Sequence, residues 1–236
     1  MQTDEILQKL YTLFAAGETV TLHNLFKGLA ISNDAKIIRM EGSAAWFSVP
    51  RFQATCLELH RRTYIQSEYL PLIARASVVS VNFIESTALL TAFVYTGSDI
   101  GNRRSMRVHP REETPLEMTI KGLNIKGHLA DISNDGLGIW TSATFYGPAV
   151  FASHTPIVVN LSLEPKKPPL RLPGTVMNVT KISETYRLGV STTADPANRL
   201  AVVQYVSQRQ AELQRELRLM SDMFFQIAAG KGGALP

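Results

Sequence analysis

Cysteine is almost absent from this sequence of 236 residues, since Cys56 is the only one. A single thiol excludes an intrachain disulfide and any zinc or iron–sulfur site built from several thiolates. The most apolar stretch, residues 74–95, is interrupted by Asn82, Glu85 and Ser86, so it lacks the roughly 20 apolar residues of a membrane-spanning helix. The N-terminus carries acidic residues where a secretory signal carries basic ones. We therefore expect a cytoplasmic protein that is not exported and has no membrane span.

Motifs of enzyme active sites are missing as well. The sequence has no GxxxxGK[ST] phosphate loop, no HExxH and no GxSxG, and its five histidines are dispersed without an i, i+4 pair. Gly136 and Gly138 begin like a dinucleotide fingerprint, but the third glycine is absent and a strand follows. Cys56 lies among apolar residues, which favours a buried small hydrophobe over a reactive thiol. We predict no enzyme, no catalytic residue, no metal site and no cofactor.

Composition and charge indicate a globular protein with one local basic cluster. Hydrophobic residues make up 45% and charged residues 19% of the chain, which is typical of one or two folded domains. Residues 1–100 contain 8 Lys+Arg against 9 Asp+Glu, and residues 101–236 contain 16 against 11. The basic residues are scattered except at Arg103, Arg104, Arg107 and Arg111. This pattern favours a local anion site over a surface that tracks nucleic acid, so nucleic acid is not the expected partner.

The N-terminal part of the chain reads as a short helix followed by a small β domain. Helical spacing is shown by Ile6, Leu7, Leu10, Leu13 and Phe14, with Thr3 or Asp4 as the expected N-cap and Gly17 as the end. Segments rich in β-branched and aromatic residues then predict strands at 20–25, 35–40, 45–49, 53–59, 75–83 and 88–95. Residues 96–102 contain two glycines and several small polar residues, which is typical of a linker. We predict a β-rich domain over residues 1–97.

The remaining sequence predicts a second barrel and a long helix. Six short strands are expected at 116–121, 126–132, 137–141, 157–163, 175–182 and 186–191, with an irregular connection at 145–151. They predict an antiparallel barrel domain over residues 98–193. Asp195 and Pro196 then start an amphipathic helix, within residues 194–230, whose apolar residues recur every three or four positions up to Gly230. Packing on the barrel is the favoured interpretation, and a homodimer through a coiled coil of this helix remains the alternative. The predicted fold class is mainly β.

One constellation of residues carries a specific chemistry. It combines an RxxxR pattern just after the linker with a DxSxxG pattern in the second barrel, formed by Arg103, Arg104, Arg107, Asp131, Ser133 and Gly136. Arginine can donate two bonds to the O6 and N7 edge of guanine, stack on a base, and pair with phosphate. A carboxylate can accept from N1 and N2 on the opposite guanine edge, a hydroxyl can add a contact, and glycine permits close backbone approach. Either pattern alone is typical of a solvated loop or a turn, but their order and spacing favour a phosphorylated guanine ligand.

At these residues the sequence resembles the PilZ domain family, bacterial receptors for the second messenger cyclic di-GMP. The resemblance covers about residues 101–193, with Tyr186–Val190 similar to the family's closing strand, and it implies a six-stranded antiparallel barrel. It implies that Arg103 and Arg107 contact guanine and phosphate, with Arg104 between them assisting. It further implies that Asp131 and Ser133 read a guanine edge. The order of domains and the tail helix resemble the two-domain YcgR-like arrangement, although no motif in residues 18–96 supports that half.

The resemblance implies a receptor in which the ligand is a switch rather than a substrate. Clamping of the ligand by the arm at residues 101–107 is expected to order the neighbouring linker and change the domain arrangement. The output is then regulation of motility, biofilm or exopolysaccharide through a protein partner such as the flagellar motor or polysaccharide machinery. Two alternatives remain, a cyclic di-GMP-controlled DNA-binding transcriptional regulator and a PilZ adaptor that does not bind the ligand.

Overall fold

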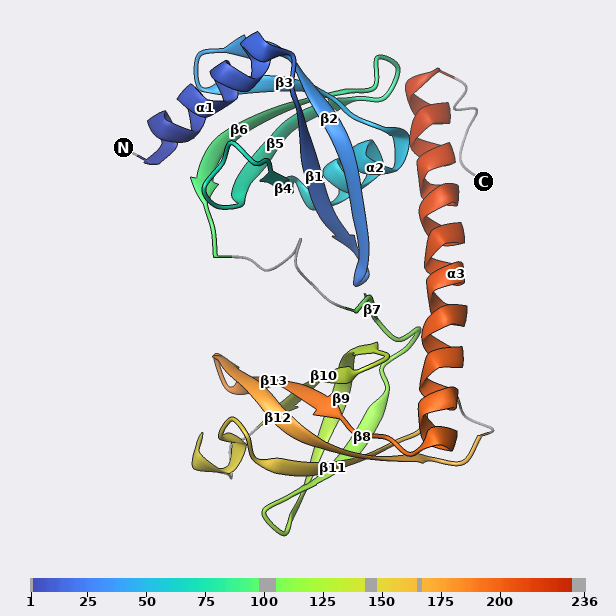
Figure 1. The fold of residues 1–236 in the computed structure, drawn as a ribbon. Helices are drawn as coiled ribbons and strands as arrows, with labels where there is room; N and C mark the ends of the chain where they lie inside the picture. Colours follow the sequence, from blue (N-terminus) through green and yellow to red (C-terminus); the bar gives the residue numbers. More distant parts are fainter. Residues whose placement is uncertain (1, 98–104, 143–147, 165–166, 231–236) are drawn as a thin grey trace. The chain divides into compact units, whose positions relative to one another are not determined.

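The computed structural model describes residues 2–97, 105–142, 148–164 and 167–230, drawn in Figure 1. The chain divides into two compact units, the first made of residues 1–26, 30–104 and 213–236 and the second of residues 27–29 and 105–212. The C-terminal helix α3 (Pro196–Ala228) contributes to both units. Among the described helices, none combines the length and the apolar character that crossing a membrane requires.

The first unit is built around a closed barrel of six strands in the order β1-β2-β3-β6-β5-β4. The strands are β1 (Thr19–Phe26), β2 (Leu29–Glu41), β3 (Ala44–Ser48), β4 (Arg62–Gln66), β5 (Ala74–Asn82) and β6 (Thr87–Tyr95). Alternating residues point inward, as in β3, where Ala45 and Phe47 are fully buried between half-buried neighbours. The predicted β-rich character of this half is confirmed.

Helix α1 (Gln2–Ala16) packs against the core of this barrel, as predicted. Ile6, Leu10 and Leu13 are completely buried, which accounts for their helical spacing in the sequence. Gly17 ends the helix with a φ of 68°, in the left-handed region that glycine adopts without strain. The predicted N-cap is wrong, because the helix already begins at Gln2 and the expected cap residues lie within its first turn.

The strand predicted at residues 53–59 is also wrong, since helix α2 (Arg51–His60) occupies this stretch. Pro50 precedes the helix in an extended conformation, and Arg61 ends it in the left-handed region with its N–H bonded to the Leu57 carbonyl. Residues 53–57 are all buried, so the sequence shows no amphipathic alternation to mark a helix. Burial on several sides hid the helical period, and β4, which the prediction lacked, follows directly and completes the barrel.

The second unit contains the other six-stranded antiparallel barrel. Its strands are β8 (Pro115–Ile120), β9 (Leu123–Ser133), β10 (Gly136–Ser142), β11 (Pro156–Leu161), β12 (Leu170–Ile182) and β13 (Thr185–Thr192). They follow the order β10-β13-β12-β11-β8-β9, and pairing of β9 with β10 closes the ring. All six predicted strands are confirmed. A seventh strand that the sequence did not predict, β7 (Arg107–Val108), adds to the edge of β9.

The connection predicted at residues 145–151 is described only from Pro148, where it forms a 3₁₀ helix, η1 (Pro148–Phe151). Phe151 is fully buried and its ring packs against Tyr186 with the centroids 5.3 Å apart. This segment therefore contributes an anchor to the core of the second barrel rather than a solvated loop.

Helix α3 confirms the predicted C-terminal helix and its start. Asp195 caps it, because its carboxylate accepts the N–H groups of Ala197 and Asn198, each at 3.0 Å. Buried residues recur along one face, at Val202, Tyr205, Val206, Arg209, Leu213, Leu217 and Ser221. Near its C-terminal end, Phe224 and Phe225 pack against Phe83 of the first unit, with ring centroids 5.3 and 5.2 Å away. The amphipathic packing role is thus confirmed within each unit.

Candidate functional site

Four of the six predicted ligand residues lie in described parts of the second barrel. Arg107 is in β7, Asp131 and Ser133 are at the C-terminal end of β9, and Gly136 is the first residue of β10. Arg103 and Arg104 fall outside the described residues, as does most of the predicted linker at 96–102. The structure thus brings together the DxSxxG pattern and the second arginine of the RxxxR pattern.

The end of β9 places Asp131 and Ser133 on one face of the strand. The β9–β10 register shifts between Gly138, which pairs with Asp131, and Ile139, which pairs with Leu129, so Ala130 is an extra residue. After this bulge, residues two positions apart face the same way, and Asp131 and Ser133 are both 4% exposed. Arg107 of β7 pairs with Ser133 in register. Three predicted residues therefore meet where β7 pairs with the end of β9.

The Asp131 carboxylate lies between two arginines. Its Oδ2 accepts a short hydrogen bond from Nη2 of Arg187, a residue of β13. Its Oδ1 is 3.6 Å from Nη1 of Arg107, outside hydrogen-bond distance, and is a buried oxygen without a hydrogen-bond donor among the described residues. A buried carboxylate is stable only when paired. The two guanidinium groups supply that pairing and leave one carboxylate oxygen able to accept from a ligand.

Glycines open space around these side chains. A Cβ on Gly138 would lie 2.7 Å from Asp131 Oδ2 and 2.8 Å from Arg187 Nη2, so a side chain there would displace the ion pair. A Cβ on Gly136 would collide with the backbone carbonyl of Val190, and one on Gly189 with the side chain of Asn178. The close backbone approach expected at Gly136 is therefore present. The backbones of β10 and β13 lie too close together there for a residue with a side chain.

Two cavities of the second unit adjoin the arginine–aspartate pair. The smaller, of about 130 Å³, is lined among others by Arg107, Ser133, Gly136 and Asn178. The larger, of about 500 Å³, is lined among others by His109, Asp131, Trp140 and Arg187. Arg107 thus lines one cavity and its ion-pair partner Asp131 lines the other. A ligand with two separate bases and a charged backbone could use both cavities.

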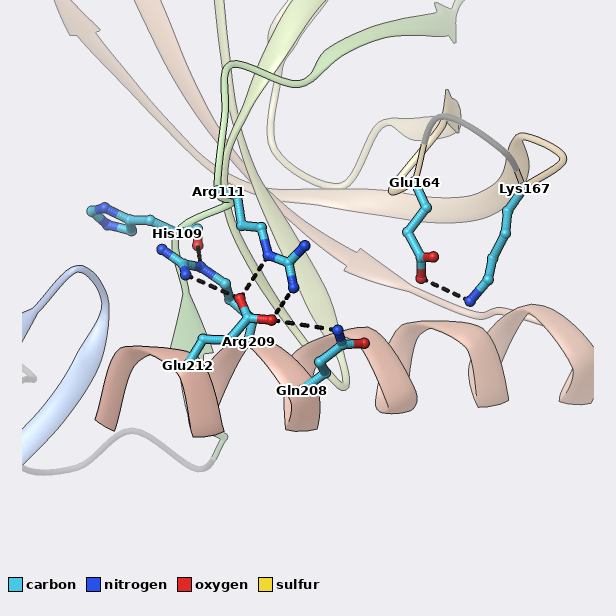
Figure 2. Close-up of polar contacts among 7 residues, drawn as sticks. All are labelled: His109, Arg111, Glu164, Lys167, Gln208, Arg209 and Glu212. Carbon is cyan, nitrogen blue, oxygen red and sulfur yellow. Dashed lines mark hydrogen bonds and ion pairs between the residues drawn. The ribbon is translucent and has the colours of Figure 1, made fainter. Parts of the chain in front are cut away.

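His109 follows β7 and joins this site to α3. Its N–H donates to the carbonyl of Lys27 at 2.9 Å, and its carbonyl accepts from Arg209 Nε at 3.1 Å, a contact visible in Figure 2. Partial desolvation lowers the pKa of the His109 imidazole; the nearby Asp131 charge opposes this effect, and cationic neighbours such as Arg187 and Arg209 add to it. The lowered pKa favours the neutral form of the imidazole beside the larger cavity.

Arg187 and Trp140 are site residues that the sequence reading missed. Both lie in predicted strands, Arg187 within Tyr186–Val190 and Trp140 within residues 137–141. A signal was available, because Tyr186, Leu188 and Val190 alternate as core residues and so place Arg187 on the outer face. Only the strand order reveals that this face adjoins Asp131. Within the described residues, no group of three or more His, Cys, Asp or Glu side chains could hold a metal ion.

Comparison with known families gives one match. The family model of the PilZ domain matches residues 101–208, a span that contains both arginine and DxSxxG patterns. The resemblance stated from the motifs is therefore confirmed. None of the curated proteins compared with the chain matches it.

Several solved structures are similar to the chain. YcgR of Escherichia coli in complex with c-di-GMP is 12% identical, with a TM-score of 0.43, and the match covers 94% of this chain and 95% of that one. The K. pneumonia MrkH–c-di-GMP complex is 13% identical, with a TM-score of 0.47, and the match covers 91% and 96%. The Bacillus subtilis inhibitor of motility MotI/DgrA is 13% identical, with a TM-score of 0.41, and the match covers 83% and 97%.

Proposed function

Residues 101–208 belong to the PilZ domain family, and on this basis we propose that the chain is a cyclic di-GMP receptor. The proposal rests on one observation: Arg107, Asp131 and Ser133 lie close together where β7 pairs with β9. Arg107 is in register with Ser133 and 3.6 Å from the Asp131 carboxylate. Residues that are 24 and 26 positions apart in the chain thus form one cluster of the chemistry that a phosphorylated guanine requires.

Each side chain of the cluster has a distinct role in the proposed complex. Arg107, whose side chain is 40% exposed, can pair with a phosphate oxygen or with the O6 and N7 edge of guanine. Asp131 can accept from N1 and N2 on the opposite edge through Oδ1, which accepts no hydrogen bond among the described residues. The Ser133 hydroxyl now donates to the Gly136 carbonyl at 3.2 Å and can turn to a ligand at little cost. Both signs of charge therefore face the same ligand.

We place the remaining contacts on the arm before β7. Arg103 and Arg104 lie four and three positions before Arg107 in the sequence, in the segment that joins the predicted linker at 96–102 to the barrel. Their guanidinium groups complete the neutralisation of the two phosphates of the ligand. The domain limits we propose are residues 1–97, 98–193 and 194–230. Ligand contacts made by the arm therefore affect the boundary between the first two domains, at residues 97 and 98.

The consequence of binding is a change in the arrangement of the domains. An arm that clamps a dianion loses conformational freedom, and the linker attached to it loses freedom at the same time. We propose that this change exposes or hides a surface for a protein partner, and that the output is motility, biofilm formation or exopolysaccharide synthesis. The ligand leaves unchanged, so the chain acts as an effector and carries out no reaction.

Isothermal titration of the full chain with cyclic di-GMP tests the receptor function, with GTP as the control nucleotide. Arg103→Ala, Arg107→Ala and Asp131→Ala variants are titrated beside the wild type. Arg171→Ala is the matched control, because Arg171 is an exposed arginine of β12 that lines neither cavity next to Asp131. We expect saturable binding by the wild type and the control. Loss of a charge-assisted contact should weaken the three site variants by about 10- to 100-fold.

Absence of binding by the wild type at any ligand concentration would overturn the receptor function and leave the chain as an adaptor. Equal binding by all variants would place the ligand elsewhere. Small-angle X-ray scattering of the same protein with and without ligand tests the proposed change in domain arrangement. A change in the radius of gyration in the wild type but not in Asp131→Ala is the expected result, and identical curves would refute the domain rearrangement.

A further inference from the structure

Arg187 forms a cross-strand pair with Trp140 on the outer face of the second barrel. The two residues are directly opposite each other in the β10–β13 register, and the Arg187 guanidinium lies 5.4 Å from the centroid of the Trp140 ring. A guanidinium over an indole face is attracted by the ring and restricted in its rotation. The half-buried Trp140 therefore acts as a platform that holds Arg187 in one place.

From this platform Arg187 of β13 reaches Asp131 on β9, on the far side of β10. Its Nη2 donates to Asp131 Oδ2 across Gly138, the residue of β10 that pairs with Asp131. A Cβ at position 138 would lie 2.7 Å from that oxygen, so only glycine leaves the path open. Gly138, which in the sequence looked like a fragment of a dinucleotide fingerprint, thus serves this contact.

The contact with Arg187 gives the two oxygens of the Asp131 carboxylate different environments. Oδ2 is held by Arg187, whereas Oδ1 is buried, has no hydrogen-bond donor among the described residues, and belongs to a side chain that lines the cavity of about 500 Å³. Rotation of the carboxylate would break the Arg187 bond. Arg187 and Trp140 line the same cavity as Asp131, so the orientation of Oδ1 is set by a contact within the wall of that cavity.

We infer that Arg187, held by Trp140, is a positioning residue that determines guanine specificity at this site. By fixing Oδ2 it presents Oδ1 to the exocyclic 2-amino group and N1–H of a guanine. Hypoxanthine has the same O6 and N7 edge but lacks the 2-amino group, so an oriented Asp131 distinguishes the two bases. A polar site built to pair with one group discriminates strongly against a ligand that lacks it. The inference rests on the proposed cyclic di-GMP receptor function.

The test compares cyclic di-GMP with cyclic di-IMP, which differs only in the two 2-amino groups. Titrations use the full-length wild type, Arg187→Met and Arg171→Met as a matched control with the same change at a distant exposed arginine. Methionine keeps much of the length of arginine but cannot donate to Asp131. We expect the wild type and the control to prefer cyclic di-GMP by about 10- to 100-fold. Arg187→Met should lose that preference, with cyclic di-IMP affinity nearly unchanged.

Trp140→Leu gives a second variant that keeps the Arg187 charge and removes only its platform. It should lie between the wild type and Arg187→Met in preference for the guanine ligand. Thermal unfolding of each variant checks that the barrel is intact.

A variant that weakens both ligands by the same factor would overturn the inference, because Arg187 would then act on affinity or folding alone. Tighter cyclic di-GMP binding by Arg187→Met would also overturn it, since Arg187 would then compete with the base for Asp131. Failure of the wild type to bind either ligand would refute the receptor function itself, which separates the two failures.

Discussion

Arg111 donates to Glu212 through Nε at 2.7 Å and through Nη2, and so joins the segment after β7 to α3 with a two-point contact. Arg209 donates to the same carboxylate at 3.2 Å and to the His109 carbonyl at 3.1 Å. Figure 2 shows both arginines converging on Glu212. Bidentate pairing gives this contact a defined geometry that a single ion pair lacks. The residues next to the proposed ligand arginine, Arg107, are therefore anchored on the helix.

Glu212→Gln should destabilise the second unit by removing the charge that both arginines face. Hydrogen bonds from Arg111, supported by Arg209, lower the pKa of Glu212 from 4.5 to about 2, against the opposing effect of burial. We expect the midpoint of thermal unfolding at pH 7 to fall by about 2–4 °C, the size of a well-formed but partly exposed ion pair. Differential scanning calorimetry of both proteins measures the change.

The same pair predicts a pH dependence with a defined sign. A carboxyl whose pKa is lower in the folded than in the unfolded state stabilises the protein above the unfolded value of 4.5. This contribution is lost as the pH falls from 4.5 toward 2, so the difference between wild type and Glu212→Gln should shrink over that interval. Glu58→Gln is the control, because Glu58 belongs to the first unit and its carboxylate pairs with Arg61 at 2.7 Å. A difference that is independent of pH would show that the charge of Glu212 is not the cause.

Gly138→Ala should separate Asp131 from Arg187. The added methyl group would lie within 2.8 Å of atoms of both side chains, too close for contact without movement. We expect a loss of stability of about 1–3 kcal/mol, as for other overpacked sites. Cyclic di-GMP binding should weaken by about tenfold or more because the carboxylate is displaced. Chemical denaturation and calorimetric titration measure the two effects.

Gly97→Ala is the matched control, since a Cβ at Gly97 meets nothing within 4 Å. It should leave stability close to the wild-type value, and it is a control for stability alone because Gly97 lies in the predicted linker. If Gly138→Ala binds the ligand as well as the wild type does, the Asp131–Arg187 contact has no part in recognition.

Cys56 should be unreactive in the folded protein. The residue is completely buried in α2, and burial raises the pKa of its thiol from 9.0 to about 12. Because the thiolate is the nucleophile, modification by Ellman's reagent at pH 8 should be about 1000-fold slower than for a free cysteine. Full reaction after unfolding in guanidinium is the control. Rapid modification of the native chain would contradict the buried position of α2.

Much of the fold could be predicted from local sequence, and the error at residues 53–59 shows where local information ends. The strands of the second barrel alternate buried and exposed residues, as in Leu116, Met118 and Ile120 of β8, and each was predicted close to its observed bounds. Helix α2 is instead buried at five consecutive positions, so it presents no period to read. Arg209 of α3 is another residue whose burial local sequence does not predict, since this arginine is 5% exposed and hydrogen-bonded to the carbonyl of His109.

The candidate site also contains some relationships that local sequence predicts and others that it does not. Spacing alone related Asp131 to Ser133, because residues two apart share a face of a strand. The contact of Asp131 with Arg187, 56 residues away, follows from the order of β9, β10 and β13 in the barrel and from the missing side chain at Gly138. No local pattern encodes strand order, since it depends on which hydrophobic faces close the ring.

Local sequence was thus sufficient to predict the family of the second domain, its six strands, the helix that follows it and the residues of the proposed guanine site. These properties depend on side-chain identity, turn chemistry and short-range periodicity. The addition of β7 to the edge of β9, the helical conformation of α2, and the contact of Arg187 with both Trp140 and Asp131 follow from the tertiary structure alone. Those properties depend on contacts between distant residues, whose free energy arises from burial and charge pairing once the barrel is closed.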